Sequence, residues 1–150
     1  MKSFLSSITI LIVLLTFTAC NKQNKNTAMR EEVKDGVFIH ISYGTEDPHR
    51  VLMALSLAEK MSADNDVIVY FDIRGVDVVL KDSPDITFSH FASSKTQLQN
   101  LLNKGITIMA CPGCLKAAGK TKEDLAEGIS VADKDKFFNF TKGRIVTIDY

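Results

Sequence analysis

The sequence lacks a net charge. Its 150 residues contain 18 Lys and Arg against 18 Asp and Glu. Proteins attract nucleic acids mainly through a basic surface that neutralises phosphates, so this balance argues against a nucleic-acid partner. Internal repeats and low-complexity runs are also missing, and the length fits one domain with a core of its own.

Cysteine is scarce, with three residues at Cys20, Cys111 and Cys114. No second Cys-x-x-Cys and no neighbouring His supplies the further ligands that a zinc site needs. The segment around Gly44 holds a single glycine, which is a weak signal for phosphate binding. We therefore expect no bound cofactor and no zinc site.

The first twenty residues, MKSFLSSITILIVLLTFTAC, differ from the rest of the chain. Lys2 forms a short positive region, residues 8–15 are apolar, and FTA precedes Cys20. This pattern resembles a bacterial lipoprotein signal with FTAC as the lipobox. The resemblance implies cleavage before Cys20 and a lipid on that residue. The alternative is an uncleaved membrane anchor, although the apolar stretch is short for a membrane span.

The chain is thus expected to have three parts: a signal peptide at 1–19, the lipidated Cys20 with a flexible polar tether to residue 36, and a folded domain at 37–150. We expect the protein in the bacterial cell envelope, held by its lipid, with the domain in the periplasm. In such an oxidising compartment a disulfide between Cys111 and Cys114 can persist.

Apolar runs alternate with helical patterns along the folded part. The patterns predict strands at 37–42, 66–73, 106–110 and 144–150, and helices at 48–61, 94–104, 121–128 and 133–140. Asp47 is the expected N-cap of the first helix, and Ser94 with Gln97 has capping-box spacing at the second. Residues 74–82 fit either a strand or a helical turn, and 83–93 fit a loop. Continuous apolar strands between helices indicate a parallel sheet covered on both faces.

In an open sheet of this kind, functional groups gather at the carboxyl ends of the strands. Residues 42–45, residues 72–75 and Cys111 all follow predicted strands. Pro112 is excluded from a strand or a helix interior, so Cys111 is expected at a helix N-cap, where unpaired N–H groups favour a thiolate. Cys111 is therefore the predicted nucleophile, and Cys114, one turn later, is the predicted resolving thiol.

Three other interpretations of the cysteine pair stay open. A structural disulfide is one, although so small a loop constrains the unfolded chain poorly. A soft-metal site is the second, because MACPGC has a Met-x-Cys-x-x-Cys pattern whose thiolates suit Cu(I). A thioredoxin-type oxidoreductase is the third, but its motif follows an early strand in a different order of elements.

Other polar and aromatic residues have less specific interpretations. His40 is expected to pack on the sheet or in the core, and His90 to be exposed in a loop. His49 is a weaker candidate for pairing with a thiolate, because helix N-termini disfavour a protonated His. Asp72 and Arg74 are expected to form a surface ion pair. The aromatic residues expected in the core or in a subunit contact are Phe137, Phe138 and Phe140.

Three segments together resemble the DsrE/DsrF-like family of small sulfur-relay proteins: VFIHISYGTEDPHRVLMALSLAEKM, VIVYFDIRGVDVVLKD and GITIMACPGCLKAAGKTKEDLAEGI. The resemblance implies a three-layer α/β/α sandwich with an open, mostly parallel sheet of about five strands, assembled as a trimer or hexamer. It also implies a thiol that accepts and passes on sulfur as a persulfide. Cys111 and Gly119 have the family spacing, and Cys114 matches a second cysteine that many members carry.

The chain also departs from the family pattern. Ala118 stands where an Arg is common, and export is unusual because the sulfur-relay members are cytoplasmic. We therefore expect a sulfur donor or acceptor, or a thiol redox protein, as the partner, and not the tRNA-modification or sulfite-reductase partners of those members. Enzyme status is left open. The second hypothesis is a non-catalytic binding or assembly module in which the cysteines form a staple or bind a soft metal.

Overall fold

The structure is a computed structural model of the chain and describes residues 33–150. The expected signal peptide, Cys20 and most of the expected tether lie outside the described residues. No helix within residues 33–150 is long and apolar enough to cross a membrane. The described residues form one compact unit.

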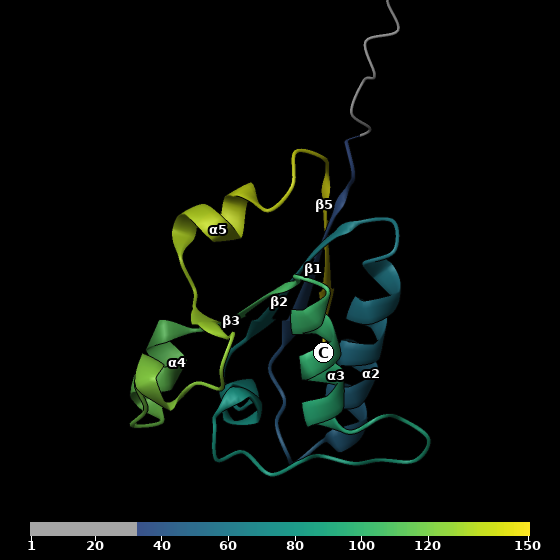
Figure 1. Cartoon of the computed structure of the whole chain (residues 1–150). Helices are drawn as coiled ribbons and strands as arrows, with labels where there is room; N and C mark the ends of the chain where they lie inside the picture. The colour runs from purple at the N-terminus through teal and green to yellow at the C-terminus, as the bar shows by residue number, and fades with distance from the viewer. Residues whose placement is uncertain (1–32) are drawn as a thin grey trace, which may run out of the picture. The chain divides into compact units, whose positions relative to one another are not determined.

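An open parallel sheet lies at the centre of this unit (Figure 1). The strand order is β4-β3-β2-β1-β5, and every neighbouring pair is parallel. The strands are β1 (Gly36–Ile41), β2 (Asp66–Phe71), β3 (Thr107–Ala110), β4 (Ser130–Val131) and β5 (Ile145–Asp149). The predicted α/β sandwich with a parallel sheet of about five strands is confirmed.

The helices connect these strands. They are α2 (Pro48–Met61), α3 (Ser94–Asn103), α4 (Pro112–Ala117) and α5 (Lys134–Asn139), with the 3-10 turns η1 (Gly75–Val79) and η2 (Lys122–Asp124). The Asp47 carboxylate accepts the Arg50 N–H, which confirms it as the N-cap of α2. After α3 the chain turns through Gly105 at φ +75°, a conformation that only glycine adopts without strain.

Two predicted helix starts need correction. Ser93, not Ser94, caps α3, because Ser94 is buried and its hydroxyl instead accepts the Ile86 N–H. Thr121 and Asp124 do form a capping box, but only one 3-10 turn follows. The chain becomes extended at Leu125, which forms a bridge with Leu80, so a helix to Gly128 is excluded.

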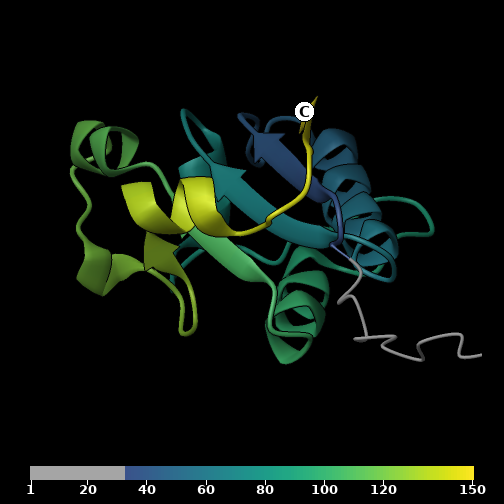
Figure 2. The ribbon, with the colours of Figure 1, turned by 90° about the horizontal axis from the view of Figure 1, so that it is seen from above.

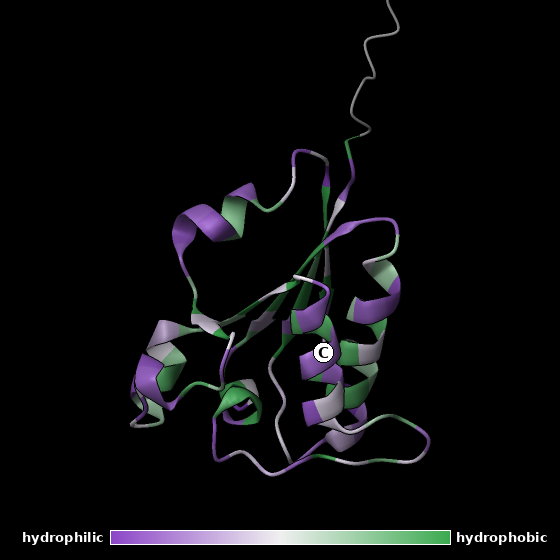
Figure 3. Cartoon of the chain, viewed as in Figure 1, coloured by the Kyte–Doolittle hydropathy of each residue, from purple (hydrophilic) through white to green (hydrophobic). Residues whose placement is uncertain are grey.

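The two faces of the sheet are covered differently. Figure 1 shows α2 and α3 on one side of the sheet and α5 on the other. The side chains of Ile39, Ile41 and Phe71 are fully buried in the core cluster on the α2–α3 side. On the α5 side, Phe137 packs on Phe38, with ring centroids 4.9 Å apart. Figure 3 shows α5 as mostly hydrophilic with a hydrophobic part. Its sequence KDKFFN contains two apolar side chains, Phe137 and Phe138, so this face of the sheet has only a partial apolar cover.

The cysteine-bearing helix α4 lies at the β3 side of the molecule, away from α2 (Figure 2). On the face of the sheet that α5 partly covers, His40 of β1 stands beside Tyr70 of β2 in the strand register. Tyr70 in turn pairs with Met109 of β3, two residues before Cys111. Alternation along the strands therefore directs His40, Tyr70 and Cys111 toward the same half-covered face.

Candidate functional site

Cys111 and Cys114 meet at the carboxyl edge of β3. The Cys111 N–H donates to the Phe71 carbonyl across 2.8 Å, which ties the end of β3 to the end of β2. Cys111 is the N-cap of α4, as predicted, and its Sγ accepts the Cys114 N–H at 3.4 Å. Both side chains are half-buried, and neither thiol is in a disulfide.

Hydrogen bonds favour the thiolate of Cys111. Burial alone raises the pKa of this thiol, but the Tyr70 hydroxyl, the Cys114 N–H, the Cys114 thiol and the Gly113 N–H together lower it below its ordinary value. Because α4 has only six residues, its macrodipole is small, and the local donors are the main cause. Cys111 is therefore the more nucleophilic cysteine.

The surroundings of Cys114 have the opposite effect. Burial raises the pKa of the Cys114 thiol, the Ile73 N–H lowers it, and the Cys111 sulfur and the Asp72 charge raise it further, so that the net shift is upward. One thiol is thus prepared to be a thiolate, while its neighbour keeps a proton that it can donate. This asymmetry fits the predicted order of a nucleophile followed by a resolving thiol.

Tyr70 is a site residue that the sequence analysis missed. Burial, followed by the nearby Cys111 sulfur, raises the pKa of its phenol, so the hydroxyl stays protonated and donates to Cys111. Its place inside an apolar strand gave no sign of this role. Tyr70 faces the thiols only because β2 and β3 pair in the observed register.

His40 lies between two carboxylates. Its Nε2 is 2.9 Å from Asp72 Oδ2, and its Nδ1 is 2.8 Å from Asp149 Oδ1. Burial lowers the pKa of the imidazole, but the hydrogen bonds and charges of Asp72 and Asp149 outweigh burial, and the net shift is upward. Both ring nitrogens face carboxylate oxygens, so the protonated ring can donate from both. The predicted packing on the sheet is correct, through Phe38, but a core role is wrong.

Other predicted contacts are not formed. Arg74 pairs with Asp77 at 3.6 Å instead of with Asp72, whose charge is directed at His40. The turn after β2 passes through Ile73 at φ +45°, which separates Arg74 from the strand edge.

The remaining histidines have aromatic contacts. His49 stacks on Phe88 with ring centroids 4.9 Å apart, so the pairing with a thiolate for which it was the weaker candidate is not formed. His90 is exposed, as predicted, and stacks on Phe91. Of the predicted phenylalanine cluster, Phe137 packs on the sheet, whereas Phe138 is 63 % exposed.

A groove of about 550 Å³ opens beside Cys114. It is lined by Ile73, Arg74, Asp77, Cys114, Ala117 and Ala118. The two alanines leave one side of the thiol uncrowded. The turn that forms the other wall is held by Gly75, where a Cβ would collide with the Ile41 carbonyl. A reactant can therefore approach Cys114 without displacing the core.

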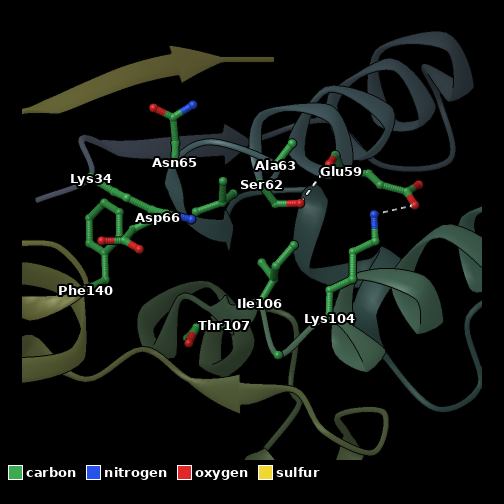
Figure 4. Close-up of a pocket in the computed structure, with 12 residues that line it drawn as sticks. Lys34, Glu59, Ser62, Ala63, Asn65, Asp66, Lys104, Ile106, Thr107 and Phe140 are labelled. Atoms are coloured by element: carbon green, nitrogen blue, oxygen red, sulfur yellow. Dashed lines mark hydrogen bonds and ion pairs between the residues drawn. The ribbon is translucent and has the colours of Figure 1, made fainter. Parts of the chain in front are cut away.

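A second cavity, of about 600 Å³, lies at the amino ends of the strands (Figure 4). Asp66 and Thr107, which begin β2 and β3, line it together with Phe140. Lys104 and Glu59 also line this cavity, and the Lys104 ammonium group pairs with Glu59 Oε1 at 2.9 Å. This cavity contains no thiol. Within residues 33–150, no group of three or more His, Cys, Asp or Glu side chains is arranged to hold a metal ion.

Several solved structures resemble this fold, and two of them are described next. A protein of unknown function, MTH1491 from Methanobacterium thermoautotrophicum, is 22 % identical with a TM-score of 0.57, covering 75 % of this chain and 98 % of that one. The ychN protein from E. coli is 15 % identical with a TM-score of 0.54, covering 77 % of this chain and 99 % of that one. No curated protein sequence matches the chain significantly.

These structural likenesses concern the fold alone, whereas a family model concerns the sequence as well. The model of the DsrE/DsrF-like family matches residues 35–143, which include all strands except the last and both thiols. The chain therefore belongs to the DsrE/DsrF-like family.

Proposed function

We propose that Cys111 carries sulfane sulfur as a persulfide or exchanges disulfides, and that Cys114 resolves what Cys111 holds. The family is generally related to sulfur relay. The observation that carries the proposal is the placement of the two thiols, with the Cys114 N–H donating to the Cys111 sulfur at 3.4 Å. The nearby Tyr70 hydroxyl supports it, because this group helps to lower the pKa of the Cys111 thiol. A half-buried sulfur whose surroundings favour the thiolate suits sulfur exchange, and a merely structural disulfide does not require it.

The proposed chemistry needs a thiolate at Cys111 and a protonated thiol at Cys114. The Cys111 thiolate attacks a sulfane sulfur or a disulfide of the donor, and the donor's thiolate leaves. The bound sulfur then passes to an acceptor thiol, or Cys114 attacks Cys111 and releases it. The groove beside Cys114 supports access for a donor or acceptor from that side.

Mass spectrometry of the reduced protein after treatment with inorganic polysulfide tests this function. We expect a mass gain of whole sulfur atoms in the wild type and none at the site in Cys111→Ala. Cys114→Ala should retain the gain for longer, because the resolving thiol is missing. The absence of an adduct at either cysteine contradicts the carrier function. Stoichiometric Cu(I) binding that needs both thiols, without sulfur transfer, would instead favour the soft-metal alternative.

We also propose that Cys20 carries a lipid that holds the domain at the membrane, with the domain in the periplasm. The FTAC sequence supports this proposal. Cys20→Ser should move the protein from the membrane fraction to the soluble fraction, and unchanged fractionation contradicts the anchor. Sedimentation of the same soluble variant tests the expected trimer or hexamer. The exposed apolar residues that support such a contact are Phe138, Ile145 and Val146.

A further inference from the structure

One oxygen of Asp72 has no partner in the structure. Asp72 Oδ2 accepts from His40 Nε2 at 2.9 Å, but Oδ1 is buried and makes no hydrogen bond. A carboxylate oxygen that is removed from water without a donor is costly, and such groups are rare in folded proteins. An unpartnered carboxylate oxygen is suited to accept a proton during a reaction, and the charge of Asp72 acts on the Cys114 thiol.

The chain on either side of Asp72 contacts both cysteines. The preceding residue, Phe71, accepts the Cys111 N–H through its carbonyl at 2.8 Å. The following residue, Ile73, directs its N–H to the Cys114 sulfur. Asp72 is therefore fixed between the two points where β2 contacts the thiol pair, and its charge acts on Cys114.

We propose that Asp72 is the proton acceptor for Cys114 when this thiol resolves an adduct on Cys111. The inference rests on the proposed function and adds a residue to it. His40 acts as a positioning residue: its Nε2 occupies Asp72 Oδ2, which leaves Oδ1 as the free acceptor. Asp149 Oδ1 holds the other side of the ring, 2.8 Å from His40 Nδ1.

The step balances as an ordinary thiol–disulfide exchange. At the start of the step, Cys111 Sγ is bonded to the carried sulfur, and that sulfur is bonded in turn to hydrogen or to an organic group. The Cys114 proton moves to Asp72 Oδ1 while Cys114 Sγ forms a bond to Cys111 Sγ. The bond between Cys111 Sγ and the carried sulfur breaks, and the electron pair leaves with that sulfur, which takes the proton from Asp72. The two cysteines are oxidised to a disulfide, the carried sulfur is reduced, and an external dithiol must reopen the disulfide.

Asp72 has two effects on Cys114, and they oppose each other in a kinetic test. Its negative charge helps to raise the pKa of the Cys114 thiol, which by itself reduces the thiolate fraction and slows attack. Its free oxygen removes the proton, which speeds attack. If Asp72 acts only as a charge, Asp72→Asn should accelerate resolution. If Asp72 accepts the proton, the same substitution should slow it.

The experiment uses the reduced protein and dithionitrobenzoate, an aromatic disulfide that releases a coloured thiolate. The first equivalent reports attack by Cys111, and the second reports attack by Cys114 on the mixed disulfide. In Asp72→Asn we expect the first release to be largely unchanged and the second to slow roughly a hundredfold at about pH 6. Cys114→Ser should stop after the first equivalent, which assigns the second release.

The matched control is Asp149→Asn, which removes the other carboxylate from His40 by the same chemical change. Its second release should stay within about threefold of the wild type, since general-base catalysis is worth far more than that. If Asp149→Asn slows the second release as much as Asp72→Asn, loss of charge around His40 explains the effect, and the role of Asp72 is overturned. A second release that Asp72→Asn accelerates or leaves unchanged also overturns it.

The wild-type pH profile gives a test that does not depend on the folding of a variant. Attack by an unassisted thiolate slows about tenfold for each pH unit below the thiol pKa, whereas attack assisted by Asp72 should stay nearly level between about pH 8 and pH 6. A tenfold decrease per unit contradicts the proposal.

The other titratable groups that surround this network are His40 of β1, Tyr70 of β2, Asp149 of β5, and Cys111 and Cys114 at α4. If the first equivalent does not come from Cys111, the proposed function fails, and the role of Asp72 fails with it.

Discussion

At the scale of single residues, Tyr70 is the first of several groups that lower the pKa of the Cys111 thiol. Its hydroxyl is kept protonated by burial and by the nearby sulfur, so it serves as a fixed donor to the thiolate. The Cys114 N–H provides a second donor at 3.4 Å, a longer contact. A phenolic O–H that donates to a charged sulfur is a stronger interaction than one between neutral groups. The thiolate therefore depends on a side chain from the neighbouring strand.

Tyr70→Phe should raise the pKa of the Cys111 thiol, because the ring remains while the donor is lost. The alkylation rate of Cys111 by iodoacetamide at neutral pH should fall roughly tenfold, as expected for one hydrogen bond to a charged group. The measurement is the pH dependence of alkylation, read by mass spectrometry of the Cys111 peptide. Tyr43→Phe is the control, because the Tyr43 ring lies under the Arg50 guanidinium. Identical pH profiles for Tyr70→Phe and the wild type contradict the role of the hydroxyl.

At the scale of the elements, the turn after β2 departs from ordinary backbone geometry. Ile73 has φ +45°, and a β-branched residue in this region stores strain of roughly 1–3 kcal/mol. The turn places the Ile73 N–H on the Cys114 sulfur and lets Gly75 approach the Ile41 carbonyl. The strain is thus located at the junction between β2 and the candidate site. Nothing in the apolar pattern of β2 predicts it.

The elements that local physics specifies could be predicted from the sequence. Continuous apolar runs mark β1, β2 and β3, and the Asp47–Pro48 pair marks the start of α2. β4 could not be predicted, because two residues are too few to show a period, and pairing with β3 alone makes it a strand. The helix expected after Thr121 failed for a similar reason. A contact from Leu125 to Leu80, distant in sequence, overrides the local capping signal.

In the candidate site, too, the residues marked by local sequence could be predicted, and those placed by tertiary structure could not. Cys111 and Cys114 were predicted because their spacing and the proline between them are local features. Tyr70 and the His40–Asp149 pair could not be predicted, because strand register brings each to its partners from distant parts of the sequence. Asp72 was paired with the wrong neighbour, since Arg74 is closer to it in sequence than His40. Local spacing therefore identified the nucleophile, and tertiary structure supplied the groups around it.

At the scale of the whole molecule, the His40 network connects three of the five strands that the structure describes. Asp72 follows β2, His40 lies in β1, and Asp149 ends β5, which is the last strand along the chain and an edge strand of the sheet. β5 is otherwise weakly covered, with Ile145 and Val146 about half exposed. His40 therefore links an exposed edge strand to the centre of the sheet. The strength of this connection depends on the protonation of one side chain.

This connection makes stability depend on pH in a predictable direction. The folded protein raises the pKa of His40, so near and above neutrality the native state binds up to one proton more than the unfolded state. The stabilisation is fully present below about pH 6.5, the value for an unperturbed histidine, and is lost as pH rises through the higher folded pKa.

Urea unfolding of the reduced protein should therefore show a free energy of unfolding that falls over this window in the wild type. The fall should be smaller in His40→Gln and unchanged in His90→Gln, whose side chain is exposed. Equal slopes for His40→Gln and the wild type would mean that the carboxylates do not hold a charged imidazole, and that Asp72 must be positioned by another group.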